Sequence, residues 1–129
     1  MDRPISHVMA KTVWTAAMED TADKVEELLS RRSLSAVPVV DENRNVFGIV
    51  STADIMHLHT AKKNPKSVRA WELCTYKPIV VHPDTSVAEV AKLMVEHKIH
   101  HILVSENWKL LGIVSALGFV ERFLLKGGA

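Results

Sequence analysis

Ser51 and Asp54 are the two side chains whose type and spacing point most directly to chemistry. They stand three residues apart, directly after an apolar run that ends at Val50. A serine followed three residues later by an acid is typical of a helix N-terminus, where backbone N–H groups lack partners and the helix dipole is positive. Such a helix N-terminus, which we call a helix entrance, can hold a polar or anionic ligand. The same pair can also act only as a helix cap, so the pattern leaves both roles open.

The motif around Ser51 occurs twice. Gly48-Ile49-Val50-Ser51 returns as Gly112-Ile113-Val114-Ser115, 64 residues later, but the second copy has Gly118 in the place of the acid. In both copies an apolar run ends in a serine and a pattern of longer period begins, which predicts a strand followed by a helix. The sequence therefore indicates two repeats of one structural unit, which differ in the side chain three residues after the serine.

Hydrophobic spacing and turn residues predict the elements that position these motifs. A helix beginning behind Ser86 is indicated by a capping-box pattern with Glu89 and by apolar residues at helical spacing. In the first half we expect a helical turn at 4–9, a strand at 12–16, a helix at 22–29, strands at 36–40 and 46–50, and a helix from 52 to about 63. In the second half we expect a short helix at 68–73, a strand at 79–81, a helix from 87, strands at 102–104 and 110–114, and a helix at 117–124.

Each half reads strand, helix, strand, strand, helix, which places the chain in the α/β class, of the α+β type. We expect a first repeat at 1–61, a polar linker at 62–66 and a second repeat at 67–129, together forming one module. A unit of about 60 residues has too small a core to stand alone. The two repeats are therefore expected to be related by a pseudo-two-fold axis, with their sheets packed face to face and two related clefts between them.

Composition excludes several classes of function. The formal net charge of +1 gives no electrostatic reason to expect a nucleic-acid or membrane partner. Apolar stretches of about five residues are far below the roughly 20 needed to span a bilayer, and the N-terminus does not resemble a secretory signal, so a cytoplasmic location is expected. Cys74 is the only cysteine, which excludes an internal disulfide and predicts a buried structural thiol.

The repeated motifs resemble the CBS domain, and two such domains in tandem resemble a Bateman module. The resemblance covers essentially the whole chain. Members of this family are not usually catalytic in the module itself, and many bind adenine nucleotides or adenosyl compounds and form disc-like dimers. The residues that carry the resemblance are Val37-Pro38-Val39-Val40-Asp41, Gly48-Ile49-Val50-Ser51-Thr52-Ala53-Asp54, Asp84-Thr85-Ser86-Val87-Ala88-Glu89-Val90 and Gly112-Ile113-Val114-Ser115.

The resemblance implies a set of nucleotide-binding residues. Asp54 would accept both ribose hydroxyls, and the Ser51 hydroxyl would face ribose or phosphate. His100 and His101 are similar to basic residues that some members place beside the phosphate. The second copy departs from the ribose pattern because it has Gly118 in place of the acid and Leu103 in place of Pro38. The residues expected at the backbone of the adenine site are Lys11, Thr12, Val13, Val37 and Pro38.

We therefore expect a regulatory, homodimeric module that binds AMP, ADP, ATP or S-adenosylmethionine and relays occupancy to an effector protein. We expect no enzyme activity and no obligatory cofactor. We also expect no metal, because the histidines at 57, 59, 97, 100 and 101 lack supporting acids. The alternative is an interaction protein that keeps the fold without binding a ligand. Its contact surface would be Trp108 and the terminal helix with Phe119, Val120, Phe123, Leu124 and Leu125.

Overall fold

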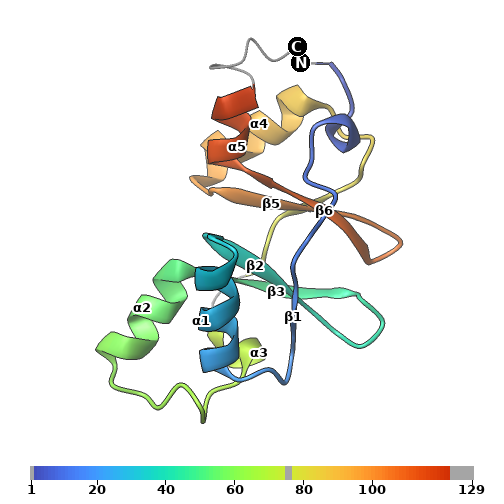
Figure 1. The fold of residues 1–129 in the computed structure, drawn as a ribbon. Helices are drawn as coiled ribbons and strands as arrows, with labels where there is room; N and C mark the ends of the chain where they lie inside the picture. Colours follow the sequence, from blue (N-terminus) through green and yellow to red (C-terminus); the bar gives the residue numbers. More distant parts are fainter. Residues whose placement is uncertain (1, 75–76, 123–129) are drawn as a thin grey trace. The chain divides into compact units, whose positions relative to one another are not determined.

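The computed structural model describes residues 2–74 and 77–122, and the chain divides into two packing units (Figure 1). The central unit is the continuous stretch Trp14–Lys77. The split unit combines Met1–Val13 with Pro78–Ala129. Each unit contains one three-stranded sheet with helices, so the mixed α+β class predicted from the sequence is confirmed.

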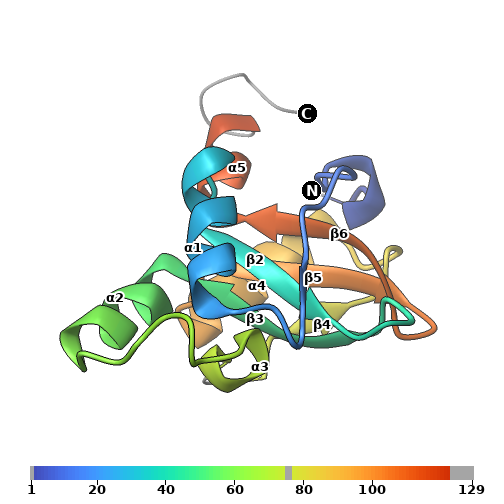
Figure 2. The same ribbon diagram turned by 60° about the horizontal axis from the view of Figure 1, so that its bottom comes forward.

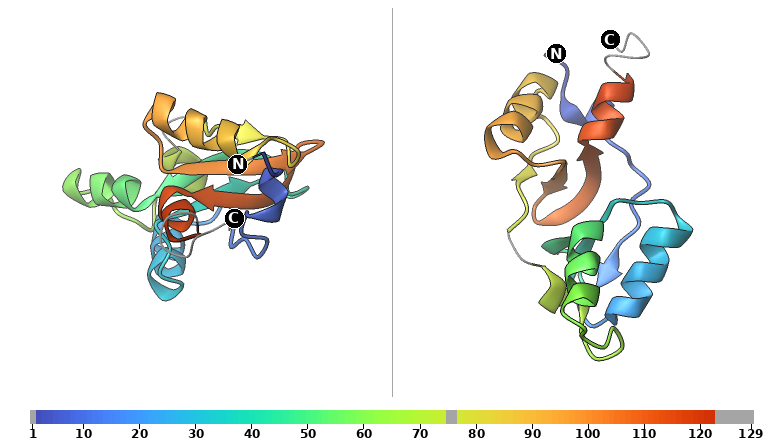
Figure 3. Two further views of the ribbon diagram at one scale, coloured as in Figure 1. Left: turned by 90° about the horizontal axis from the view of Figure 1, so that it is seen from above. Right: turned by 90° about the vertical axis from the view of Figure 1, so that its left-hand side faces the viewer.

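The central unit is built on the sheet order β1-β2-β3. β1 (Ala16–Ala17) runs parallel to β2 (Ala36–Val40), which is antiparallel to β3 (Val46–Ser51). α1 (Ala22–Arg31) and α2 (Thr52–Thr60) contact each other, and α3 (Ala70–Leu73) packs on β3 (Figures 1 and 3). Figure 2 shows α2 continuing directly from the end of β3, which is where Ser51 lies.

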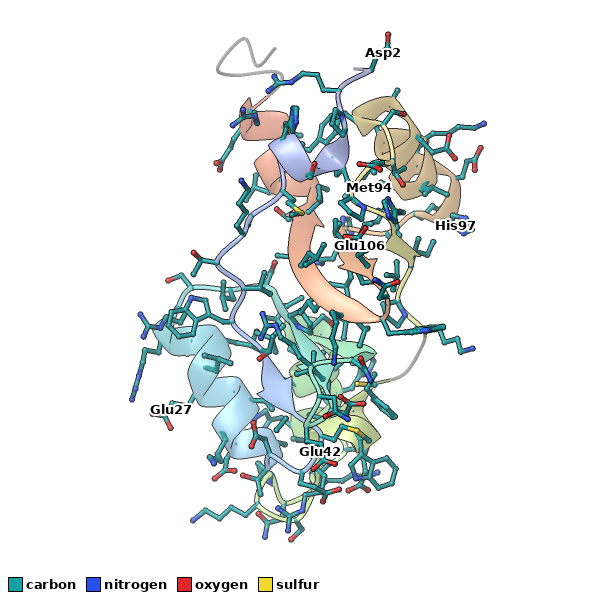
Figure 4. All side chains as sticks on the ribbon, turned by 90° about the vertical axis from the view of Figure 1, so that its right-hand side faces the viewer. Asp2, Glu27, Glu42, Met94, His97 and Glu106 are labelled. Carbon is teal, nitrogen blue, oxygen red and sulfur yellow. The ribbon has the colours of Figure 1, made fainter. Side chains whose placement is uncertain are left out.

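The core of the central unit forms where α1 covers the sheet. Val25 and Leu29 lie one helical turn apart on α1 and pack with Val37 and Val39, which alternate along β2. Burial of each such side chain stabilises the fold by roughly 1.5–3 kcal/mol. Charged residues occupy the opposite face of α1, and Glu27 points away from the ribbon (Figure 4).

The split unit repeats this arrangement with the order β4-β5-β6. Its elements are η1 (Ile5–His7), β4 (Val80–Val81), α4 (Val87–His97), β5 (His101–Glu106), β6 (Lys109–Ser115) and α5 (Ala116–Val120). α4 lies along the sheet in the left view of Figure 3. The capping position predicted for α4 is confirmed, since Ser86 Oγ accepts a hydrogen bond from the Glu89 N–H at 3.1 Å.

The N-terminal segment belongs to the split unit because its backbone pairs with that unit. The Ile5 N–H donates to the Thr85 carbonyl at 2.7 Å, and Ala10 and Ile113 exchange two backbone hydrogen bonds at 3.0 and 3.3 Å. The central unit has a matching bond, from the Ala70 N–H to the Asp20 carbonyl at 2.7 Å. The segment around α3 thus pairs with the central unit in the same way as the segment around η1 pairs with the split unit.

Several predicted boundaries were wrong. The strand expected at 12–16 is only Ala16–Ala17, because this edge strand pairs with β2 at Val39 and Val40 alone. The helix expected to reach residue 63 ends at Thr60, since Lys62 adopts a left-handed conformation with φ of 56°. α5 ends at Val120, and the predicted helical residues Phe123, Leu124 and Leu125 lie outside the described residues.

The predicted repeat boundaries at residues 61 and 67 and the face-to-face packing of the sheets stay predictions. Among the described residues, none of the helices combines the length and apolar character that a membrane span requires.

Candidate ligand sites

The helix entrance of the central unit brings together Ser51 and Asp54. The Asp54 carboxylate Oδ2 accepts hydrogen bonds from the Ser51 N–H at 2.7 Å and from the Ser51 hydroxyl at 3.0 Å. In return, Ser51 Oγ accepts a longer bond from the Asp54 N–H at 3.4 Å. This is a complete capping box, and it fixes a carboxylate that is only 7% exposed at the first turn of α2.

The neighbouring strand places the predicted adenine residues at increasing distance from this entrance. Ala36 lies opposite Ser51, Val37 opposite Val50 and Pro38 opposite Ile49. The Val37 side chain is part of the helix-covered core, so only its backbone is available to a ligand. The roles predicted for Val37 and Pro38 in adenine binding stay predictions.

A cavity of about 700 Å³ lies beside α2 within the central unit. Asp54 and Glu72 supply carboxylates to its wall, and His57 and Lys63 supply nitrogen donors. A ligand with hydroxyl or amino groups fits the two acids, and the volume is within the range of small-molecule sites. The remaining lining residues are Ala53, Leu58, Thr60, Ala61, Val68 and Leu73.

Cys74 lies against Gly48 of the repeated motif in the central unit. A Cβ atom at Gly48 would lie 2.7 Å from Cys74 Sγ, so the glycine of the repeated motif is required by the close approach of this side chain. Burial, assisted by the negative charge of Asp54, raises the pKa of the Cys74 thiol to about 11. Cys74 is half-buried and not fully buried as the sequence predicted, and its structural role stays a prediction.

The helix entrance of the split unit is simpler. Ser115 Oγ accepts a hydrogen bond from the Gly118 N–H at 3.0 Å, and Gly118 supplies no carboxylate. His101 lies opposite Ser115 in the sheet, and the His100 carbonyl accepts from the Ala116 N–H at 2.8 Å. Burial, and to a smaller extent the nearby His100, lower the pKa of His101. Neutral imidazole therefore predominates at His101 at neutral pH, and a phosphate role for the two histidines stays a prediction.

Lys11, Thr12 and Val13 also belong to the split unit. They follow the bridge between Ala10 and Ile113 and precede β1, so Thr12 and Val13 do not form the strand that was predicted from residue 12. Of the nine predicted site residues, the structure joins Ser51 with Asp54 by side-chain hydrogen bonds. The assembly of all nine into one site stays a prediction.

A second cavity, of about 110 Å³, lies within the split unit beside α5. Its walls are formed by the N-terminal segment, the end of β6 and one face of the terminal helix. Arg122 is its charged lining residue and Ser115 its hydroxyl. The other lining residues are Val8, Ala10, Ile113, Val114, Gly118 and Phe119.

Sequence reasoning did not assign a role to Arg122, His57, Lys63 or Glu72. Arg122 could have been found by comparing the two copies position by position, since it follows Ser115 by the same spacing that separates Leu58 from Ser51. Glu72 had no such signal, because it reaches the cavity beside α2 only through the packing of α3 in the central unit.

Comparison with known families agrees with this architecture of two repeated α+β units. The sequence model of the CBS domain matches residues 5–60 and again residues 70–124. The chain belongs to the CBS domain family.

Sequence relatives include an inosine-5'-monophosphate dehydrogenase from Halobacterium salinarum, 35% identical over 114 residues, which cover 87% of this chain and 22% of the relative. An uncharacterized protein, YlbB, from Bacillus subtilis is 40% identical over 84 residues, which cover 64% of this chain and 57% of the relative. The match thus extends over about a fifth of the first relative and just over half of the second.

Solved structures share the fold over nearly the whole chain. The AcuB protein from Vibrio cholerae has a TM-score of 0.88 at 23% identity, covering 98% of this chain and 93% of its own. CBSX2, crystallised in complex with AMP, has a TM-score of 0.85 at 25% identity, covering 97% and 98%. The CBS domain pair of MJ0100, crystallised with 5'-methylthioadenosine and S-adenosyl-L-methionine, has a TM-score of 0.86 at 23% identity, covering 98% and 99%.

Proposed function

We propose that the chain is a regulatory module that binds an adenine nucleotide or adenosyl compound and passes its occupancy to another protein. The observation that carries the proposal is the Asp54 carboxylate, which is buried, fixed by Ser51 and part of the wall of the cavity beside α2. A carboxylate accepts hydrogen bonds from two adjacent hydroxyls, the arrangement that a ribose presents.

Two relatives support this ligand class. CBSX2 was crystallised with AMP and matches nearly the whole chain. A second relative, 30% identical over 102 residues, is the gamma-3 subunit of a human protein kinase named for activation by 5'-AMP. AMP, ADP, ATP and S-adenosylmethionine all carry the ribose that Asp54 would hold.

Binding would regulate a partner only through a difference in affinity between two arrangements of the module. We propose that this partner is a separate effector protein and that the module itself has no catalytic role. We also propose that it acts as a homodimer in the cytoplasm. The exposure of Leu117, 69%, gives α5 an apolar surface that supports self-association.

A second candidate function is an interaction module without a ligand. It is favoured by Trp108, which is 79% exposed at the tip of the β5–β6 hairpin, where an aromatic side chain suits a protein contact. It is also consistent with the capping box, because Asp54 has a structural role in that box without any ligand.

The test is calorimetric titration of the purified chain with AMP, ATP and S-adenosylmethionine, beside an Asp54→Ala variant. Under the proposed function one of these ligands binds and the variant loses the binding. Ser86→Ala serves as a matched control, because it removes the cap of α4 in the other unit without touching the cavity beside α2. Absence of binding by all three ligands, or equal binding by the Asp54→Ala protein, would leave the interaction module as the function.

A further inference from the structure

The two cavities occupy corresponding places in the two units. The cavity of the central unit is lined by α2 and by the segment around α3, which packs on β3. The cavity of the split unit is lined by α5 and by the N-terminal segment, which pairs with β6. Asp54 and Leu58 face the cavity of the central unit. Gly118 and Arg122 stand at the matching positions of the split unit, with the same spacing from Ser115.

The substitutions reverse the charge of the cavity. Replacement of the acid by Gly118 removes the group that would hold a ribose. Leu58 is buried, whereas its counterpart Arg122 is exposed and brings a guanidinium cation to the cavity wall. Within the part of the chain that the structure describes, no carboxylate pairs with Arg122.

The two serines also differ in their hydroxyl hydrogens. The Ser51 hydroxyl donates to Asp54 at 3.0 Å. Ser115 Oγ only accepts, from the Gly118 N–H, and among the described residues no acceptor takes its hydrogen. The cavity of the split unit therefore contains a cation and a free hydroxyl donor, both suited to the oxygens of one anion.

The remaining walls limit the rest of such a ligand. Val8, Ile113 and Phe119 present apolar surface. A volume of about 110 Å³ corresponds to roughly four water molecules at their liquid volume, which is too small for a nucleotide. A carboxylate or phosphate group with a short apolar body fits both the size and the lining.

We propose that the split-unit cavity is a second ligand site, which binds a small anion bearing a carboxylate or phosphate group. The anion's oxygens contact the Arg122 guanidinium and the Ser115 hydroxyl, and any apolar part lies against Val8 and Phe119. This site has no ribose acceptor. It does not depend on nucleoside binding at Asp54, so the two proposals fail independently.

The experiment is an NMR titration of the full chain with inorganic phosphate in one arm and butyrate in the other. A chloride salt keeps the ionic strength constant in both arms. We expect saturable shifts of the Ser115 and Gly118 amide signals in at least one arm. Stronger binding of phosphate would identify a phosphate group as the ligand, and stronger binding of butyrate a carboxylate with an apolar body.

Arg122→Leu recreates the residue pattern of the central unit and should weaken binding at least about tenfold, since a charge-assisted hydrogen bond is lost. Arg122→Gln tests the same charge if the leucine variant does not fold. Arg31→Gln is the matched control, because it removes an exposed arginine charge in the central unit away from both cavities, and anion binding should be unchanged in it. Saturable binding in neither arm, or undiminished binding by a folded Arg122 variant, would overturn the proposal.

Discussion

In both the central and the split unit a serine caps the helix that follows the last strand, but the residues after that serine differ. In the central unit the serine and a buried acid hold each other, and the next turn of the helix is apolar at Leu58. In the split unit the serine caps Gly118 alone, and Arg122 stands two residues after the end of α5. The two units have the same arrangement of strand, serine and helix, but the charged residues that line their cavities differ. The fold alone therefore does not determine what each unit binds.

The largest expected effect concerns the segment around Ile5, which packs onto the split unit, and its counterpart around Ala70 in the central unit. Ile5 is fully buried in the split unit, at the place that Ala70 fills in the central unit. Ile5→Ala should lower the free energy of unfolding by about 2–5 kcal/mol, because the cavity left behind cannot fully collapse. Urea denaturation measures the loss, and Ile5→Val should cost only about 0.5–1.5 kcal/mol. A loss as small as that for the alanine variant would show that the segment is not part of the core.

The motif glycines offer a second comparison. A Cβ at Gly112 would lie 2.9 Å from the Ala10 carbonyl oxygen, whereas a Cβ at Gly48 would meet only side-chain atoms of Cys74. Both alanine variants should be destabilised by about 1–3 kcal/mol, with Gly112→Ala the worse, because a hydrogen-bonded carbonyl cannot move aside. Cys74→Gly should partly rescue Gly48→Ala in urea denaturation, and Met9→Ala should fail to rescue Gly112→Ala. Equal rescue in both units would refute this distinction.

The helix caps should differ less. Ser51→Ala removes a cap and a donor to a buried carboxylate, at an expected cost of about 1–2 kcal/mol. Ser115→Ala removes only the cap of the five-residue α5, at about 0.5–1 kcal/mol. Thermal unfolding of the two variants side by side measures the difference. A larger cost for Ser115→Ala would contradict the hydrogen-bond pattern described for the two serines.

Ionisation of Cys74 should make stability depend on alkaline pH. The thiol pKa is raised from the ordinary value of 9.0 to about 11 in the folded protein, so its un-ionised form stabilises the fold fully below pH 9. This contribution is lost as the pH rises from 9 to 11. Thermal unfolding across this window should show a steeper decline for the natural protein than for Cys74→Ala. Parallel curves would mean that the thiol is not held away from water.

His101 should produce the smallest effect, on the acid side. Its folded pKa lies below the ordinary value of 6.5, so its contribution to stability is present above that pH and is lost as the pH falls through the folded value. His101→Ala installs the residue found at the matching place in the central unit, Ala36, and should flatten the dependence. Unfolding temperatures measured between neutral and mildly acidic pH provide the test, and an unchanged slope would count against burial as the cause.

The sequence was informative wherever local signals and tertiary packing agree. Ser86 and the apolar stripe behind it predicted α4, and the spacing of Ser51 and Asp54 predicted a capped helix entrance, which the structure confirms. The strand before Ala17 was overpredicted because β propensity cannot show how many residues find a partner in the neighbouring strand. Glu72 was missed because it reaches its cavity only through the packing of α3 on β3, whereas Arg122 was missed because the two copies were not compared beyond the position of Asp54 and Gly118.

The interrupted construction of the split unit has a consequence for synthesis on the ribosome. Residues Trp14–Lys77 form the central unit without interruption, so its native contacts are complete before β4 has been translated. The segment around Ile5 emerges first but must wait for Thr85 and Ile113, its hydrogen-bond partners, more than 75 residues later in the chain. Since contacts at long sequence separation form slowly, the chain should fold from the middle outwards, with its N-terminal segment joining last.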